Sequence, residues 1–191
     1  MKIKDQKQTI IDAFISIFNQ LGYKVTLDKV ASKLHIAKKT IYKYFTSKEE
    51  IYEFILNNTV DEITENQKVV YFDKSLSTKE KLYRILTIET TTEANVDMSR
   101  VYELVSHEPI FGKILLESYE KHWQFFILLV DQGKLEKILR PDVNARFLVG
   151  LLTNGMEMVY RTDFLRKANL TYTEAIKMLA STVLEGFYVR E

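Results

Sequence analysis

The three histidines are the side chains best suited to metal or acid–base chemistry, yet their spacing forms no known site. His35, His107 and His122 lie far apart, without a His-Glu-x-x-His pattern or repeated Glu-x-x-His pairs. The 191 residues include no cysteine, which excludes disulfides, thiolate ligands and a cysteine nucleophile. A phosphate-binding loop and a nucleophile elbow are also missing from the sequence. We therefore predict no catalytic residue, metal or cofactor, and a protein that is not an enzyme.

Residues 37–45 point instead to nucleic acid. Their sequence is Ala-Lys-Lys-Thr-Ile-Tyr-Lys-Tyr-Phe. As a helix, this segment turns Ile41 and Phe45, four positions apart, toward a core. The outward side chains are then Lys38, Lys39, Tyr42 and Lys43. Lysine and tyrosine donate hydrogen bonds to phosphates, and a helix this short can lie in the major groove of DNA.

The charge distribution agrees with a polyanionic partner at one end of the chain. Residues 1–50 contain ten lysines and five acidic residues, a net charge of +5. Because the whole chain carries only +1, the remainder carries −4. A basic head on an acidic body is typical of proteins whose head contacts DNA.

The elements that would hold this basic segment are two helices before it and one after it. Apolar residues at helical spacing over residues 6–21 predict a first helix that ends at Gly22. Thr26 can cap a second helix, which breaks at His35-Ile36, and the third helix spans residues 37–45. Ser47 and Glu50 form a capping-box pattern that opens a fourth helix. Residues 26–45 thus predict a helix-turn-helix.

The remainder of the chain is also predicted to be helical. Capping-box patterns recur at residues 77–80 and 171–174, and Pro109 and Pro141 mark two more helix starts. Gly133 is expected to end the helix that begins at Pro109. We predict an all-α fold of about nine helices without strands. A helix-turn-helix DNA-binding headpiece would occupy residues 1–50, and a helical-bundle effector-binding and dimerisation domain residues 51–191.

The helix-turn-helix segment resembles the TetR/AcrR family of transcriptional regulators. The shared residues are Thr26, Ala31, the run from Thr40 to Phe45, and Ser47-Lys48-Glu49. The sequence departs from the family at the turn, where His35 replaces the usual glycine and Ala37 replaces a capping serine. Histidine tolerates a positive φ better than most residues, so we expect the turn to form at some energetic cost.

The resemblance implies which residues contact DNA. Three side chains would approach the bases: Lys38, Lys39 and Tyr42. Five would hold phosphates: Thr26, Thr40, Lys43, Tyr44 and Lys48. The resemblance also implies that the helix after Pro109 lines a pocket for a small-molecule effector. The candidate lining is Tyr102, Phe111, His122, Trp123, Phe126 and Tyr160. Aromatic residues at helical spacing also fit a plain packed core, and that alternative stays open here.

The last two helices carry wide apolar faces with glycine and alanine at close-approach positions, namely Gly150, Gly155, Ala175 and Ala180. The resemblance makes them the halves of a dimeric four-helix bundle, although such faces could also be buried within one chain. The lysine-rich N-terminus has no apolar signal sequence behind it, and no run is long enough to span a membrane. We therefore expect a cytoplasmic protein.

Together these features predict a homodimeric DNA-binding transcriptional regulator, a repressor that a small apolar or aromatic effector releases from a near-palindromic operator. Two alternatives remain at this point. The first is a DNA-binding regulator without an effector, whose body serves only dimerisation or a protein partner. The second, more remote, is a helical enzyme.

Overall fold

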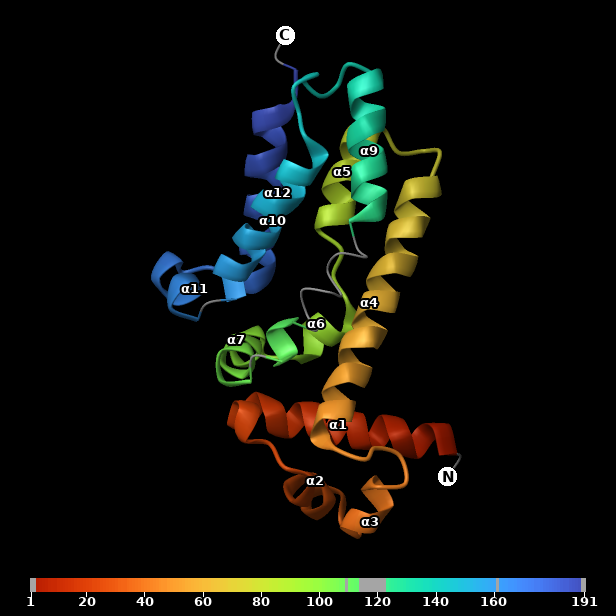
Figure 1. Cartoon of the computed structure of the whole chain (residues 1–191), viewed down its shortest axis with the longest axis vertical. Coiled ribbons are helices and arrows are strands. Elements are labelled where there is room, and N and C mark those ends of the chain that lie inside the picture. Colours follow the sequence, from red (N-terminus) through yellow and green to blue (C-terminus); the bar gives the residue numbers. More distant parts are fainter. Residues whose placement is uncertain (1–2, 109, 114–122, 161, 190–191) are drawn as a thin grey trace. The chain divides into compact units, whose positions relative to one another are not determined.

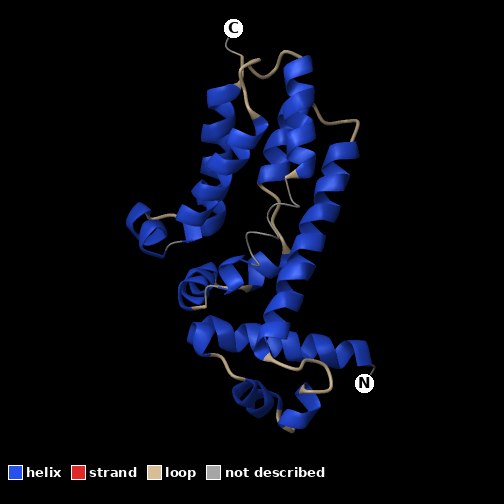
Figure 2. Ribbon diagram, in the orientation of Figure 1, coloured by secondary structure: helices blue, strands red, loops and turns tan. Residues whose placement is uncertain are grey.

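A computed structural model describes residues 3–108, 110–113, 123–160 and 162–189. Within these residues the chain forms eleven α-helices, one short 3₁₀-helix and no strand, so the predicted all-α class is confirmed (Figure 2). The two helices beyond the expected nine are short ones, α6 (Thr91–Asn95) and α11 (Thr162–Ala168). No helix in the described ranges is long and apolar enough to cross a membrane.

The helices divide into two compact units. Unit 1 consists of Met1–Thr59 and Thr91–Leu115, and unit 2 of Val60–Thr90 and Leu116–Glu191. Helix α4 (Lys48–Phe72) belongs to both, because the division falls within it. The other helices of unit 1 are α1 (Ile3–Leu21), η1 (Gly22–Lys24), α2 (Leu27–Leu34), α3 (Lys38–Ile41), α6 and α7 (Met98–His107) (Figure 1).

Unit 1 is built around the apolar face of α1. Ile10, Phe14 and Phe18 are buried there, as their helical spacing predicts. Leu104 of α7 and Phe111 belong to the same core cluster. The compact unit that holds the helix-turn-helix therefore extends well past residue 50 and includes a second stretch of chain. The functional boundary at residue 50 stays a prediction.

Unit 2 is a four-helix arrangement with a main apolar core and a smaller apolar cluster formed by Val159, Ala175 and Ile176. Its helices are α5 (Thr78–Leu86), α9 (Gln124–Leu135), α10 (Ala145–Tyr160) and α12 (Tyr172–Phe187), with α11 beside α10. Helix α5 contacts α9 and α12, and α10 contacts the same two helices from the other side, which closes a ring. Phe126, Leu129 and Leu148 are fully buried inside it. The predicted capping boxes are present at Ser77–Glu80 and Thr171–Glu174.

Two expected helix boundaries in unit 2 are wrong. Gly133 lies inside α9, which continues to Leu135. A Cβ at Gly133 would stand 3.0 Å from Leu139 Cδ1, so glycine serves close packing there and not helix termination. Pro141 lies in a turn, and the next helix starts only at Ala145. The helix expected from Pro109 falls partly outside the described residues.

Candidate DNA-binding site

The first helix of the helix-turn-helix, α2, starts as the sequence predicts. Thr26 is the N-cap of α2, in an extended conformation, and its Oγ1 accepts from the backbone N–H of Lys29 at 3.4 Å. Asp28 stands in the first turn, where the helix dipole favours an acid. Leu27, Val30 and Ala31 face the core, so α2 is held against α1 with its polar side exposed.

The turn between α2 and α3 is a Schellman motif centred on His35. The His35 N–H donates to the Ser32 carbonyl at 3.2 Å, and the Ile36 N–H donates to the Ala31 carbonyl at 3.0 Å. His35 itself adopts φ 54° and ψ 40°, the left-handed region that favours glycine. The expectation that the turn forms despite the missing glycine is confirmed. The turn is less stable than one with glycine, because the Cβ atom of His35 is unfavourable at a positive φ.

The following helix is shorter than predicted. α3 spans only Lys38–Ile41, and the chain continues to Phe45 through turns in which the Tyr44 and Phe45 amides both donate to the Ile41 carbonyl. Ala37 is the N-cap and offers no side-chain hydrogen bond, as its methyl group requires. We call residues 37–45 the recognition segment.

The recognition segment separates an inner face from an outer face. Ile41 is 0% and Phe45 1% exposed, which confirms the predicted inward pair. The side chains of Lys38, Lys39, Tyr42 and Lys43 are exposed, whereas those of Thr40 and Tyr44 are half-buried. One short segment therefore presents three cations and a phenol to solvent, which is a surface able to donate hydrogen bonds to base edges and phosphates.

An acidic side chain already holds one of these cations. Lys38 Nζ lies 2.8 Å from Asp28 Oδ2, across the turn between α2 and α3. Hydrogen bonding to Asp28 raises the pKa of Lys38. Lys38 Nζ also lies 6.0 Å from the centre of the Tyr42 ring. Asp28 therefore occupies one of the three N–H donors of the Lys38 ammonium and offsets part of its charge.

Tyr44 is fixed by a residue that sequence reasoning did not single out. Its hydroxyl donates to Gln6 Oε1 of α1 at 3.0 Å. The neighbouring Lys7 places its ammonium 3.8 Å from the centre of the Phe54 ring. The first turns of α1 thus support the end of the recognition segment. Since 38 residues separate Gln6 from Tyr44, no local pattern could have revealed this contact.

Lys48, at the start of α4, is also engaged within unit 1. Its ammonium lies 3.4 Å from Glu108 Oε1, at the end of α7, and 3.9 Å from Glu49 Oε1. Only one half of the predicted capping box of α4 forms. Ser47 Oγ accepts from the Glu50 N–H at 3.2 Å, but the Glu50 carboxylate accepts from Thr46 instead of Ser47. The Thr46 donors lower the pKa of Glu50.

The six proposed effector-pocket residues do not form one described cluster. Trp123 and Phe126 lie together in the core of unit 2, with ring centroids 5.6 Å apart. Phe111 is buried in unit 1 against Tyr52, with ring centroids 4.8 Å apart. Tyr102 lies in α7, and Tyr160 is the last residue of α10. His122 lies outside the described residues.

The last long helices have an outer apolar stripe as well as an inner one. Leu148, Leu152 and Val159 of α10 are buried within unit 2. The adjacent side of α10 exposes Phe147, Leu151 and Met158, and α12 exposes Met178. A Cβ added at Gly150 or Gly186 would meet nothing within 4 Å, whereas one at Gly155 would stand 2.7 Å from Leu179 Cδ1. Gly155 thus lets α10 and α12 approach within the chain, and the outer stripe stays uncovered.

Comparisons with known proteins identify the family to which this helix-turn-helix belongs. The sequence profile of the bacterial regulatory proteins, tetR family, matches residues 10–55. The Staphylococcus aureus negative transcriptional regulator of the icaADBC biofilm operon, IcaR, is 31% identical over 154 residues, which cover 76% of this chain and 80% of IcaR. The chain belongs to the TetR family.

Solved structures agree at the level of the fold. A TetR/AcrR-family regulator of Thermobifida fusca superposes with a TM-score of 0.71 at 23% identity, over 97% of this chain and all of that one. A transcriptional regulator of Saccharomonospora viridis in complex with choline gives 0.75 at 17% identity, over 98% and 100% of the two chains. This TetR-family chain is thus a DNA-binding transcriptional regulator, and the proteins it resembles are regulators, not enzymes.

Proposed function

We propose that this TetR-family regulator is a homodimeric repressor that acts in the cytoplasm and reads a near-palindromic operator with its recognition segment. The observation that carries the proposal is the division of that segment into a buried pair, Ile41 and Phe45, and an exposed basic face. Lys38, Lys39 and Tyr42 would approach the bases. The phosphate contacts would come from Thr26, Thr40, Lys43, Tyr44 and Lys48. Repression is inferred from the negative regulator IcaR.

The test is a DNA-binding titration. A duplex would be selected from a random-sequence pool with the purified chain and then titrated by fluorescence anisotropy at several salt concentrations. Replacing Lys38, Tyr42 and Lys43 together by alanine should abolish the preference for the selected duplex and flatten the salt dependence, because lysine contacts to phosphate release counterions. Lys74→Ala, an exposed lysine in unit 2, is the control. Unchanged affinity and selectivity in the triple variant would refute the assignment.

Dimerisation through α10 and α12 is supported by their outer stripe. A two-fold dimer presents two identical recognition segments, and therefore requires two inverted half-sites in the operator. Leu151→Glu with Met178→Glu places charges on the stripe and should yield a monomer in sedimentation velocity. Leu135→Glu is the matched control, because Leu135 is an exposed leucine of α9 outside the stripe. A wild-type chain that is monomeric at micromolar concentration would exclude this proposal.

An apolar or aromatic effector that lowers DNA affinity is the third part of the proposal. The candidate pocket residues remain Tyr102, Phe111, His122, Trp123, Phe126 and Tyr160. A ligand that prefers the conformation unable to bind DNA must lower DNA affinity by linkage. Trp123 is the single tryptophan of the chain, so an effector near it should change its fluorescence and release DNA together.

A regulator without an effector is the second candidate function. It is favoured by one observation, namely that Phe111, Trp123 and Phe126 are all packed in apolar cores. Thermal-shift screening with aromatic, aliphatic and cationic compounds separates the two. A compound that raises Tm and also weakens the anisotropy signal supports the effector. A compound that raises Tm without any effect on DNA binding supports the second candidate.

A further inference from the structure

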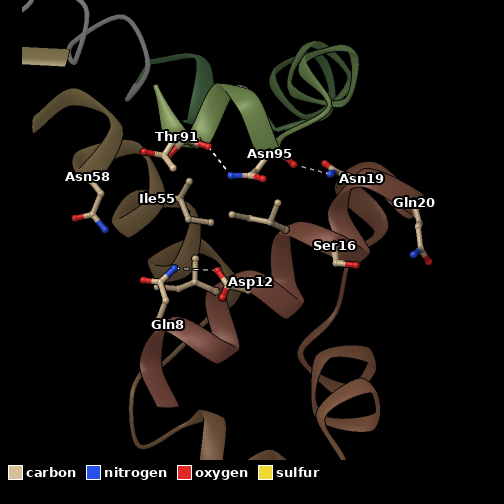
Figure 3. A pocket seen from close by; sticks show the side chains of 12 residues that line it. Gln8, Asp12, Ser16, Asn19, Gln20, Ile55, Asn58, Thr91 and Asn95 are labelled. Atoms are coloured by element: carbon tan, nitrogen blue, oxygen red, sulfur yellow. Dashed lines mark hydrogen bonds between the residues drawn. The ribbon is translucent and has the colours of Figure 1, made fainter. Parts of the chain in front are cut away.

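A groove in unit 1, away from the recognition segment, has a composition suited to a ligand. It has a volume of about 880 Å³ and lies between α1, the first turns of α4, and α6 (Figure 3). This volume falls in the range of about 300 to 1,000 Å³ that small-molecule sites occupy. Five carboxamide side chains line it: Gln8, Asn19, Gln20, Asn58 and Asn95.

Hydrogen bonds fix the wall of the groove formed by α1 and α6. Asn19 Nδ2 donates to the Asn95 carbonyl at 2.8 Å, and Asn19 Oδ1 accepts from the Asp97 N–H at 2.8 Å. Asn95 Nδ2 in turn donates to the Thr91 carbonyl at 2.7 Å. These bonds tie α1 to a segment more than 70 residues later in the chain. The wall is therefore arranged before any ligand arrives, which lowers the entropic cost of binding.

Other polar groups of the groove remain open to a ligand. Within the described part of the chain, the side chains of Ser16, Gln20 and Asn58 form no hydrogen bond with the protein. A carboxamide offers two N–H donors and one carbonyl acceptor. Groups that both donate and accept, such as hydroxyls, match that set better than a pure donor or a pure acceptor does.

The charge of the lining selects against anions. Asp12 is the one ionisable side chain among the lining residues, and its Oδ1 already accepts from Gln8 Nε2 at 2.9 Å. A lining without any cation disfavours an anionic ligand. A fully apolar ligand would leave the amides desolvated and unpaired, at a cost of about 1–3 kcal/mol for each group. Between the amides lie three aliphatic side chains, Ile11, Ile15 and Ile55.

We propose that this groove binds a neutral polyhydroxylated molecule, a mono- or disaccharide, with its hydroxyls on the carboxamides and its C–H faces on the isoleucines. The site is separate from the effector pocket proposed above, with which it shares no residue. Helix α2 packs on the apolar face of α1. A ligand that bridges α1 and α6 therefore binds the same compact unit that holds the recognition segment.

Isothermal titration of the full-length protein with maltose, trehalose and N-acetylglucosamine tests the proposal. Choline and benzoate serve as the cationic and anionic probes. At least one sugar should bind with Kd of about 1 mM or tighter, corresponding to about −4.1 kcal/mol, and neither ion should bind in the groove. Bound sugar should also slow amide hydrogen exchange in α6. Absence of saturation by every sugar would overturn the proposal, and so would binding of choline that Asp12→Asn abolishes.

The variants locate the binding. Asn58→Ala should weaken sugar binding at least tenfold, because it removes an amide of the lining. Asn57→Ala is the matched control, since Asn57 is the adjacent exposed asparagine of α4 and does not line the groove. Asp12→Asn should leave sugar affinity within about threefold, as expected for a neutral ligand. Equal sugar affinities of the Asn57 and Asn58 variants, with both folded by circular dichroism, would refute this site. DNA titrations of the recognition-segment variants are independent of this result.

Discussion

Replacing Tyr52 by phenylalanine should stabilise the protein. Tyr52 of α4 is 6% exposed, and its ring makes edge contacts with Phe14 at 5.0 Å and Phe111 at 4.8 Å between centroids. Its hydroxyl is buried and has no hydrogen-bond partner among the described residues. Tyr52→Phe removes this hydroxyl and keeps the ring and its contacts.

The size of the effect follows from the burial of that hydroxyl. An unsatisfied buried polar group costs about 1–3 kcal/mol, and we expect Tyr52→Phe to recover about 1–2 kcal/mol. In a chain of this length that corresponds to a rise in Tm of about 2–8 °C. Thermal and urea unfolding followed by circular dichroism measure it. The control is Tyr83→Phe, because Tyr83 is 37% exposed on α5 and should change stability by less than about 0.5 kcal/mol.

Alkaline pH provides a second, independent measurement. Burial, with smaller contributions from Glu49 and Glu108, raises the pKa of Tyr52 well above its ordinary value of 10.0. The folded state therefore keeps a proton that the unfolded state releases above pH 10, so stability falls there by about 1.4 kcal/mol per pH unit from this group. Tyr52→Phe should lose that component, so the difference in unfolding free energy between wild type and variant should grow as the pH rises above 10. A variant less stable than wild type at pH 7 would refute the reasoning, because it would mean that the hydroxyl has a partner.

Three further predictions test other contacts. Asp28→Asn should tighten DNA binding by about threefold to tenfold at low salt, because it removes a negative charge that offsets the Lys38 ammonium and repels phosphates; weaker binding by anisotropy would contradict this. Gly155→Val should destabilise unit 2 by about 1–3 kcal/mol, because its side chain collides with Leu179, whereas Gly186→Ala should be neutral or stabilising by up to about 1 kcal/mol; equal unfolding midpoints would be inconsistent with close packing at Gly155. His35→Gly should stabilise the turn by up to about 1 kcal/mol, since it relieves the positive φ, and a lower Tm would exclude strain at His35.

Much of the helix-turn-helix could be predicted because its determinants are local. The Thr26 cap depends on a residue three positions away, and the inward pair Ile41 and Phe45 depends on helical spacing. The left-handed turn at His35 could be expected from its position after α2. The sequence identified the capping boxes at Ser77 and Thr171 for the same reason.

The features that could not be predicted depend on contacts outside the local helical pattern. Lys48 appears in the sequence as a free cation, and only the fold brings Glu108 to it. Similarly, the apolar residues of α10 satisfy one helical pattern, but packing buries Leu148 and leaves Leu151 exposed. Gly133 has the sequence appearance of a helix stop, yet its role depends on Leu139, six residues later. Sequence periodicity gives the faces of a helix without saying which neighbour covers each one.

The two-part composition of unit 1 has a consequence during protein synthesis. Its core needs Leu104 and Phe111, which emerge from the ribosome long after the recognition segment. Between Thr59 and Leu115, translation at about 5–20 residues per second takes about 3 to 11 s. During this time the nascent chain carries the exposed basic side chains of the recognition segment on an unfinished core. A message truncated before residue 104 would therefore yield a recognition segment whose core lacks Leu104 and Phe111.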